Sequence, residues 1–243
     1  SNPSGDTSNG KTIVDSGPNQ LHGTCTGCSG FTGEGIDPAV TGIVGSDDAM
    51  WFDQVDDYIG LDSVITVSGD FKITFNLRTT STEAQFMFSS PDAGLHTYTF
   101  ALLSGLASVQ FSWRSAGFSI ALDSPLEVNT DYAIELYRVS GLVKIKINGV
   151  EQAAGAGRSG DFLVSNLGRR SSGVSYVSGL FNSVRIDLGF NGSDDHVYIG
   201  DGVENSNWAD TGTTGGVDGI VNGSPVTVGQ KRATIPQTAD KNW

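Results

Sequence analysis

The chain has 243 residues, and its 14 basic and 27 acidic side chains give a net charge of −13. This length suits one large all-β domain. An acidic chain repels phosphate, so we expect no nucleic-acid partner. With 17% charged residues and 33 glycines, the composition excludes a coiled coil and a charge-rich disordered chain. No stretch approaches the roughly 18–20 apolar residues of a membrane span, and no basic segment followed by an apolar one opens the chain.

Residues 1–12 are polar and rich in Gly, Ser and Asn, which predicts a flexible arm. Within the arm, Gly5–Thr12 matches the phosphate-loop pattern G-x-x-x-x-G-K-T. That chemistry needs a buried strand before the loop and a helix after it. The flanking sequence predicts neither element, so we expect no nucleotide binding.

Cys25 and Cys28 form a Cys-Thr-Gly-Cys motif. A zinc ribbon needs a second cysteine pair, and the three histidines are scattered at positions 22, 96 and 196. A redox CxxC usually opens a helix after a strand, a context that is missing here. The pair is therefore predicted to be either a local disulfide or two inert thiols.

Apolar residues alternate with polar ones from Phe71 to Leu188, which is typical of half-buried strands. The alternating sets are 71, 73, 75 and 77; 86 and 88; 98, 100 and 102; 109, 111 and 113; 118, 120 and 122; 132, 134 and 136; 143, 145 and 147; and 184, 186 and 188. Asn148-Gly149 predicts a two-residue hairpin, because both residues tolerate positive φ. Evenly spaced strands with Gly-rich turns predict a sandwich, jelly roll or barrel.

Residues 191–243 are again rich in Gly, Asp and Asn and contain few apolar runs. The segment also echoes the N-terminus, because Asp210-Thr211-Gly212 resembles Asp15-Ser16-Gly17. We therefore expect a C-terminal extension, which would be the start of a second unit of the same kind.

Four passages in order resemble the concanavalin A-like lectin/glucanase superfamily, in its laminin G-like branch. Ile13–Thr24 resembles "D-x-S-G-N-x-x-H-G-T", Met50–Ile59 is similar to "F-D-G-x-D-D-Y-V", Tyr137–Val150 resembles the "R-x-G-x-x-x-x-Y-V-N-G" hairpin, and Phe181–Ile186 looks like the closing strand. The resemblance implies an antiparallel two-sheet jelly-roll sandwich over residues 13–190. The composition of Val197–Val228 also resembles bacteriophage fibre modules.

Calcium is the cofactor that the resemblance implies, because similar domains often hold one structural ion near the edge where the first and last strands meet. The implied ligands are Asp15 and Asn19, with Asp56 and Asp187 as partners. Six aspartates between residues 47 and 62 add oxygen ligands of the kind that Ca²⁺ prefers. The alternative is a solvated acidic rim whose aspartates cap turns.

Catalytic patterns are missing from the sequence. The glucanase branch uses a Glu-x-Asp-x-Glu strand, and none of the six glutamates forms one. The Gln-Ile-His or Gln-Val-His strand of jelly-roll lyases and the G-x-S-x-G elbow are also missing. We therefore expect no enzymatic activity, with a hydrolase or lyase of unrecognised site as the remaining alternative.

Ligand recognition on a sandwich needs flat aromatic rings and a few polar forks. Trp51 alternates with Met50 and Phe52 and is expected to point outward, whereas Trp113 shares the core phase of its strand. Arg114 and Arg138 fall on polar phases, where guanidinium groups bind sugar hydroxyls or carboxylates. The alternative is that Trp51 stacks on a loop and both arginines pair with surface acids.

These observations predict a non-catalytic carbohydrate-binding or adhesion module, stabilised by calcium and placed outside the cell or on a virion. Its partners would be a glycan or cell-surface polysaccharide, other virion proteins or further copies of itself. The alternative is a structural or host-recognition module of a phage tail fibre or capsid.

Overall fold

The computed structural model describes residues 12–13, 23–24, 49–91, 97–113, 116–170, 175–199, 203–204, 207–223 and 226–228. The chain divides into two compact units, residues 1–41 and residues 42–243. In the first unit, β1 (Thr12–Ile13) and β2 (Gly23–Thr24) form an antiparallel pair. All other described elements belong to the second unit.

The second unit contains two nine-stranded antiparallel sheets among the described residues. Sheet I runs in the order β12 (Val150–Glu151), β11 (Leu142–Ile147), β10 (Tyr132–Val139), β5 (Phe71–Thr79), β15 (Ser178–Leu188), β3 (Ala49–Asp53) and β20 (Val226–Val228), with β13 (Ala156–Gly157) on β11 and β16 (His196–Tyr198) on β15. Sheet II runs in the order β17 (Val203–Glu204), β18 (Asn207–Trp208), β19 (Gly219–Asn222), β4 (Tyr58–Val67), β14 (Phe162–Leu167), β6 (Gln85–Pro91), β7 (Thr97–Leu102), β8 (Ser108–Trp113) and β9 (Ala116–Ala121).

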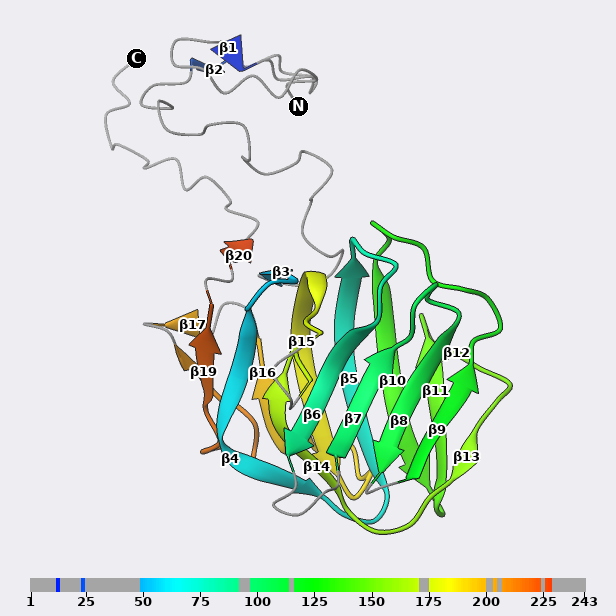
Figure 1. Ribbon diagram of the computed structural model, residues 1–243. Helices are drawn as coiled ribbons and strands as arrows, with labels where there is room; N and C mark the ends of the chain where they lie inside the picture. Colours follow the sequence, from blue (N-terminus) through cyan, green and yellow to red (C-terminus); the bar gives the residue numbers. More distant parts are fainter. Residues whose placement is uncertain are drawn as a thin grey trace, which may run out of the picture. The chain divides into compact units, whose positions relative to one another are not determined.

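The two sheets lie face to face (Figure 1), and the described residues form no helix. This arrangement confirms the predicted all-β, two-sheet jelly-roll sandwich. Accordingly, the described residues contain no helix long and apolar enough to cross a membrane.

The core lies between the sheets and follows the alternation in the sequence. Along β5, Phe71, Ile73, Phe75 and Leu77 are at most 2% exposed, while the residues between them are half-buried on the outer face. The ring of Phe75 packs against those of Phe88, Phe100 and Phe181, with centroids 5.2–5.9 Å apart. Edge-to-face and tilted aromatic pairs of this kind add to the hydrophobic stabilisation of a core.

The predicted hairpin at Asn148-Gly149 is confirmed. Asn148 and Gly149 have φ angles of 51° and 79°, the left-handed values that a two-residue turn between antiparallel strands requires. The Asn148 side chain also accepts a hydrogen bond from the backbone N–H of Ala133, over 2.8 Å. The turn is thereby tied to β10.

The C-terminal segment differs from the expected extension. Its strands β16, β19 and β20 pair with β15, β4 and β3, so the described part of residues 191–243 completes both sheets. Tyr198 and Trp208 from this segment are fully buried and pack together at 5.7 Å. The expectation of a separate second unit is therefore wrong. The sequence could not show these strands, because two to four residues are too few to show a period.

Candidate functional site

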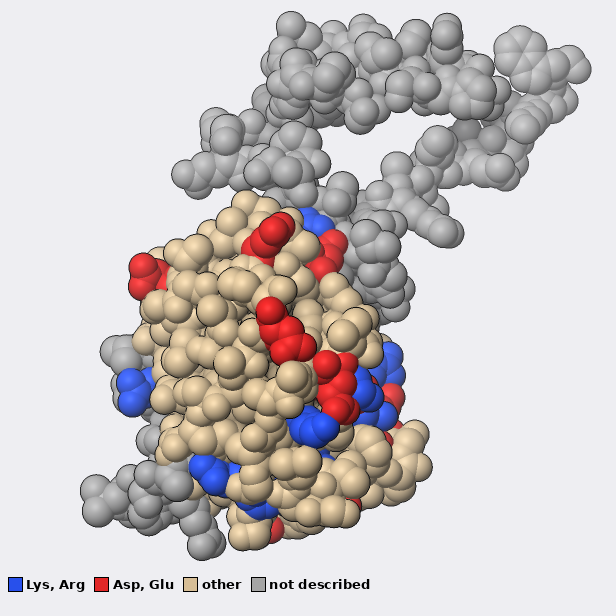
Figure 2. Space-filling model, turned by 90° about the vertical axis from the view of Figure 1, so that its right-hand side faces the viewer, with Lys and Arg blue, Asp and Glu red and all other residues tan. Residues whose placement is uncertain are grey.

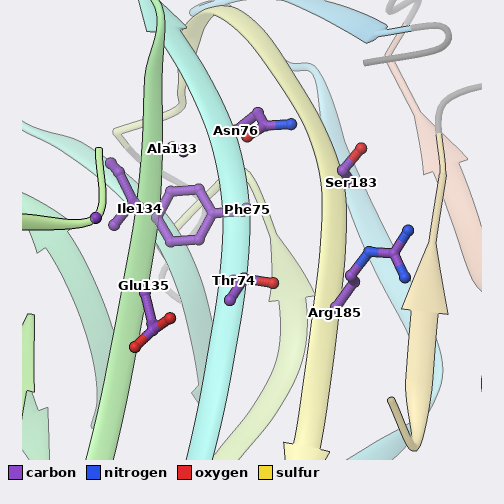
Figure 3. A pocket seen from close by; sticks show the side chains of 9 residues that line it. Thr74, Phe75, Asn76, Ala133, Ile134, Glu135, Ser183 and Arg185 are labelled. Carbon is purple, nitrogen blue, oxygen red and sulfur yellow. The ribbon is translucent and has the colours of Figure 1, made fainter. Parts of the chain in front are cut away.

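A depression of about 210 Å³ lies on the outer face of sheet I, where β10, β5 and β15 are neighbours (Figure 3). Its lining residues are Thr74, Phe75, Asn76, Ala133, Ile134, Glu135, Gly149, Ser183 and Arg185. Most of the outward-facing members are polar and at least half-buried. The depression therefore offers hydrogen-bonding groups from three strands.

Strand register explains why these groups meet. Thr74 is opposite Glu135 of β10 and opposite Arg185 of β15, so the three residues form one row across the sheet. The register of β15 shifts between Asn182 and Arg185, and Ser183 has a φ of 54°. An irregularity of this kind breaks the ladder locally and re-aims side chains. It accounts for a depression on an otherwise regular sheet.

Neighbouring charges hold the ionic groups of the depression in place. Arg185 Nη1 lies 2.7 Å from Asp194 Oδ2, and Lys146 Nζ lies 2.7 Å from Glu135 Oε1. The side of the molecule drawn in Figure 2 is mostly uncharged, with acidic and basic side chains next to one another. A ligand with many hydroxyl groups suits the depression, because such a ligand needs paired donors and acceptors and carries no net charge.

Aromatic rings flank the depression at both ends of the face. Trp51 is half-buried and lies in one row with Leu180 and Arg78. At the other end, Phe190 is 40% exposed and stacks on Tyr137 with the ring centroids 5.9 Å apart and the planes at 26°.

Tyr137 is opposite Lys72 on β5, six residues from Arg78. The strand rise therefore places the two aromatic rows roughly 20 Å apart. The predicted outward orientation of Trp51 agrees with its half-buried position between buried Met50 and Phe52.

The side chain of Arg138 is not where the sequence analysis placed it. Its predicted outward position is wrong, because the side chain is only 2% exposed. The guanidinium donates to the carbonyl oxygens of Gly69 and Gly160 and lies 4.8 Å from the ring centre of Trp113. Arg138 lies on the same phase of β10 as Ile134 and Leu136, whose side chains are also buried. Its assignment to the polar phase was therefore wrong, and the alternation in the sequence already places it inward.

The predicted calcium ligands Asp56 and Asp187 do not meet. Asp53 is opposite Ser178, and Asp187 lies nine residues further along β15, which corresponds to roughly 30 Å of strand. The Asp187 carboxylate instead accepts the backbone N–H groups of Asn191 and Gly192, each over 2.9 Å. It caps the turn after β15, so these two aspartates cannot share one ion.

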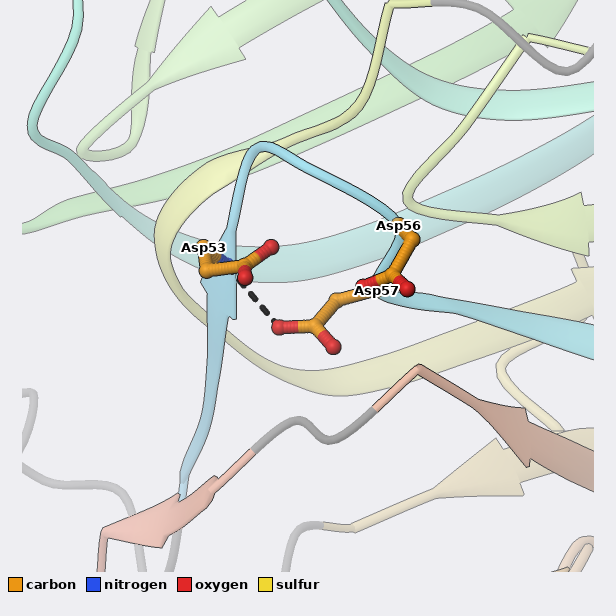
Figure 4. A group of neighbouring side chains, drawn as sticks. All are labelled: Asp53, Asp56 and Asp57. Atoms are coloured by element: carbon orange, nitrogen blue, oxygen red, sulfur yellow. Dashed lines mark hydrogen bonds between the residues drawn. The ribbon is translucent and has the colours of Figure 1, made fainter.

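Asp53, Asp56 and Asp57 come together in the turn between β3 and β4 (Figure 4). One carboxylate oxygen from each lies within 4.8 Å of the others, and oxygens bound to one Ca²⁺ are at most roughly 5 Å apart. Asp57 Oδ2 also accepts the Asp53 backbone N–H over 2.9 Å. A Cβ on Gly223 would lie 2.4 Å from Asp57 Oδ1, so the turn requires glycine there.

Several predicted residues fall outside the described part of the chain. They are Asp15, Asn19, Cys25, Cys28 and Arg114. Sequence reasoning also missed Arg185, Glu135 and Asn76, since only strand register brings them together. Their one signal was the polar phase that each occupies between apolar neighbours.

Comparisons with known proteins give similarity in structure but not in sequence. No model of a known protein family matches the chain, and no curated protein matches it. A "putative carbohydrate binding protein" from Bacteroides ovatus is 17% identical, with a TM-score of 0.57 over 76% of this chain. The match spans 60% of that protein's length. At this identity the similarity shows the shared fold.

Two further similarities are weaker. The heptameric SAP-like pentraxin from Limulus polyphemus is 11% identical, with a TM-score of 0.48 over 58% of this chain and 75% of its own. Domains LG4-5 of the mouse laminin alpha1 chain are 13% identical, with a TM-score of 0.47 over 60% of this chain and 43% of theirs.

Proposed function

We propose that the protein is a non-catalytic carbohydrate-binding module and that the outer face of sheet I recognises the glycan. One observation carries this proposal: a depression lined by polar side chains from three strands lies between the half-buried ring of Trp51 and the exposed ring of Phe190 on a single sheet face. The similarity in fold to a Bacteroides ovatus protein described as carbohydrate-binding supports it.

The chemistry of the face fits a sugar chain. Pyranose rings present C–H groups on one side, which stack on aromatic rings, and hydroxyl groups at the edge, which need paired donors and acceptors. Trp51 and Phe190 supply the rings, and Asn76, Glu135 and Arg185 supply the polar groups. Because the groups are spread over roughly 20 Å, an oligosaccharide fills the face better than a single sugar.

The proposal is tested by screening the protein on a glycan array and measuring the strongest ligand by calorimetry. We expect Trp51→Ala and Arg185→Gln each to weaken binding about tenfold or more, the effect of losing a stacking ring or a charged hydrogen bond worth about 1.4 kcal/mol. The matched control is Thr66→Ala, an exposed change on β4 of sheet II.

Three outcomes would contradict this assignment. They are the absence of any glycan ligand, equal binding by the two sheet I variants and the control, and release of new reducing ends from the bound glycan. The last would show a hydrolase. The virion role expected from residues 197–228 stays a prediction.

We also propose that a calcium ion binds Asp53, Asp56 and Asp57 and holds the turn between β3 and β4. Three carboxylates within 4.8 Å repel one another without a cation, and Trp51 lies two residues before this turn on β3. The ion would therefore fix the end of the strand that carries one aromatic ring of the glycan face.

Thermal melting with chelator and with added Ca²⁺ tests this proposal. At a concentration of about 100 times Kd, the ion should stabilise the fold by about 2.7 kcal/mol. Asp56→Asn should reduce this gain, whereas the control Asp62→Asn, an exposed aspartate outside the cluster, should keep it. Identical melting curves in both conditions would remove calcium from the proposal.

A further inference from the structure

A second, larger pocket of about 380 Å³ opens at one end of the sandwich. It is built from the turn between β4 and β5, the turn between β10 and β11, and the loop between β13 and β14. Its lining residues are Gly69, Asp70, Arg138, Gly141, Arg158, Ser159, Gly160 and Asp161. A volume of this size falls within the range of small-ligand sites, about 300–1,000 Å³.

Two buried donors, one on a residue that lines this pocket and one beside it, lack acceptors. Among the described residues, Trp113 Nε1 and Arg158 Nε are the buried side-chain nitrogens with no hydrogen-bond partner. Trp113 is 4% exposed, and its Nε1 lies 4.0 Å from the place of a Cβ on Gly160, which lines the pocket. A buried N–H without an acceptor destabilises a fold. Both groups can only donate, so the missing partner is an acceptor.

Two guanidinium groups in the same pocket have no carboxylate within ion-pair distance among the described residues. Arg138 donates to two carbonyl oxygens, and Arg158 donates to the carbonyl oxygen of Gly157 over 2.8 Å. Arg158 also lies 4.0 Å above the ring centre of Phe118. Both groups are held in position while their charges are not directly paired.

Acceptors border the same pocket. Asp70 Oδ1 accepts the Ser140 backbone N–H, and Asp161 Oδ1 accepts the Ser68 hydroxyl, each over 2.8 Å. In the described part of the chain, the second oxygen of each carboxylate has no hydrogen-bond partner. Burial lowers the pKa of the Arg138 guanidinium, and the charges of Asp70 and Asp161 act in the opposite direction. Both carboxylates therefore lie near this cation.

We propose that the end pocket binds one sugar-acid residue, with its carboxylate held by the guanidinium groups of Arg158 and Arg138 and its hydroxyls by Asp70 and Asp161, while the indole N–H of Trp113 lies beside the site. This inference rests on the proposed carbohydrate-binding function and names a substrate class for a second subsite. Guanidinium groups bind carboxylates through planar, paired hydrogen bonds.

Charge selects this ligand over two related ones. The two aspartates disfavour a small inorganic anion, because such an ion has no hydroxyl groups to offer them and is repelled by their charges. The net charge of −13 disfavours a long polyanion, because repulsion acts along its whole length. A single uronate at the end of an otherwise neutral chain reduces both costs, because it carries only one charge and its hydroxyl groups can donate to the two aspartates.

Calorimetry with two matched ligands tests the proposal. The first ligand is an oligosaccharide ending in a hexuronic acid, and the second is the same compound with its carboxyl reduced to an alcohol. We expect the acid to bind at least tenfold more tightly. Arg158→Gln and Arg158→Lys should both abolish this preference, because lysine keeps the charge but loses the planar fork. The control Arg170→Gln, at an exposed arginine outside the pocket, should preserve it.

A spectroscopic signal reports the pocket directly and is independent of those variants. The indole N–H resonance of Trp113, assigned by its loss in Trp113→Phe, should move downfield when the acid binds and stay in place with the reduced ligand. No movement, or an equal movement with sodium sulfate or sodium acetate, would overturn the sugar-acid assignment.

The results also separate this inference from the proposed function. Equal binding of the acid and its reduced form, lost in Trp51→Ala, rejects the end pocket and retains the glycan face. A preference for the acid that disappears in Arg158→Gln supports the end pocket. If neither ligand binds and the glycan array is empty, both proposals fail.

Discussion

The surroundings of a residue, rather than its type, decide what each arginine does here. Arg185 is half-buried beside the register shift of β15 on sheet I and reaches Asp194, so it lies at the surface where a ligand can contact it. Arg138 is 2% exposed, and its donors satisfy two loop carbonyl oxygens. Removing Arg138 would leave the carbonyl oxygens of Gly69 and Gly160 without their donor and would loosen both loops, so loss of binding in such a variant would not identify a contact with the ligand.

Gly179 is a position where the fold leaves no room for a side chain. Its φ is 123°, and an added Cβ would lie 2.0 Å from the carbonyl oxygen of Arg78 on the neighbouring strand. Gly179→Ala must therefore separate β15 from β5 at the edge of the core. We expect a loss of about 3 kcal/mol or more in the free energy of unfolding, the range of severe backbone conflicts, measured by urea denaturation.

Gly105→Ala is the matched control, because Gly105 also has a positive φ but an added Cβ there would meet no neighbouring atom. Gly105 has a φ of 80° and nothing within 4 Å of an added Cβ. It should cost only about 1–2 kcal/mol, the price of a left-handed conformation for alanine. Equal losses in the two variants would show that contact with β5 is not what requires glycine at position 179.

At the level of elements, the predictable strands are those in which two or more apolar residues recur at every second position. The run from Phe71 to Leu77 became β5 with its alternation intact, and Asn148-Gly149 became the predicted turn. Strands such as β18 and β19 were not predictable, because two to four residues show no period and their burial depends on β4. Resemblance to a known family supplied the two-sheet jelly-roll arrangement, and neither it nor the periodicity gave the order of the strands within the sheets.

The candidate site also contains residues that could be predicted from the sequence and residues that could not. The outward phase of Trp51 follows from its buried neighbours Met50 and Phe52, so it could be read from the sequence. The polar row beside it could not, because Thr74, Glu135 and Arg185 are at least 50 residues apart in sequence and meet only through strand register. A register shift also determines where the depression lies, and single sequences carry no clear signal for such shifts.

For the molecule as a whole, closure of both sheets depends on residues that follow the expected domain end at 190. β16 covers one side of β15, β19 extends sheet II beside β4, and β20 extends sheet I beside β3. Tyr198 and Trp208 fill the space between these strands and are fully buried. Both sheets therefore depend on pairs between strands that are far apart in the sequence.

This dependence leads to a prediction about truncation. A chain ending at residue 190 loses five strand pairings, three of them with strands that remain, and two buried aromatic side chains, each worth about 3–5 kcal/mol when truncated to alanine. Since a domain of this kind has only about 5–15 kcal/mol of net stability, we expect this chain to give no cooperative melting transition by circular dichroism.

The control for this truncation is a chain that starts at residue 42, which keeps every described strand of the second unit. It should melt within about 4 °C of the full chain, the shift that roughly 1 kcal/mol produces at this size. If the chain ending at 190 melted cooperatively at the melting temperature of the full chain, the C-terminal strands would not contribute to the stability of the sandwich.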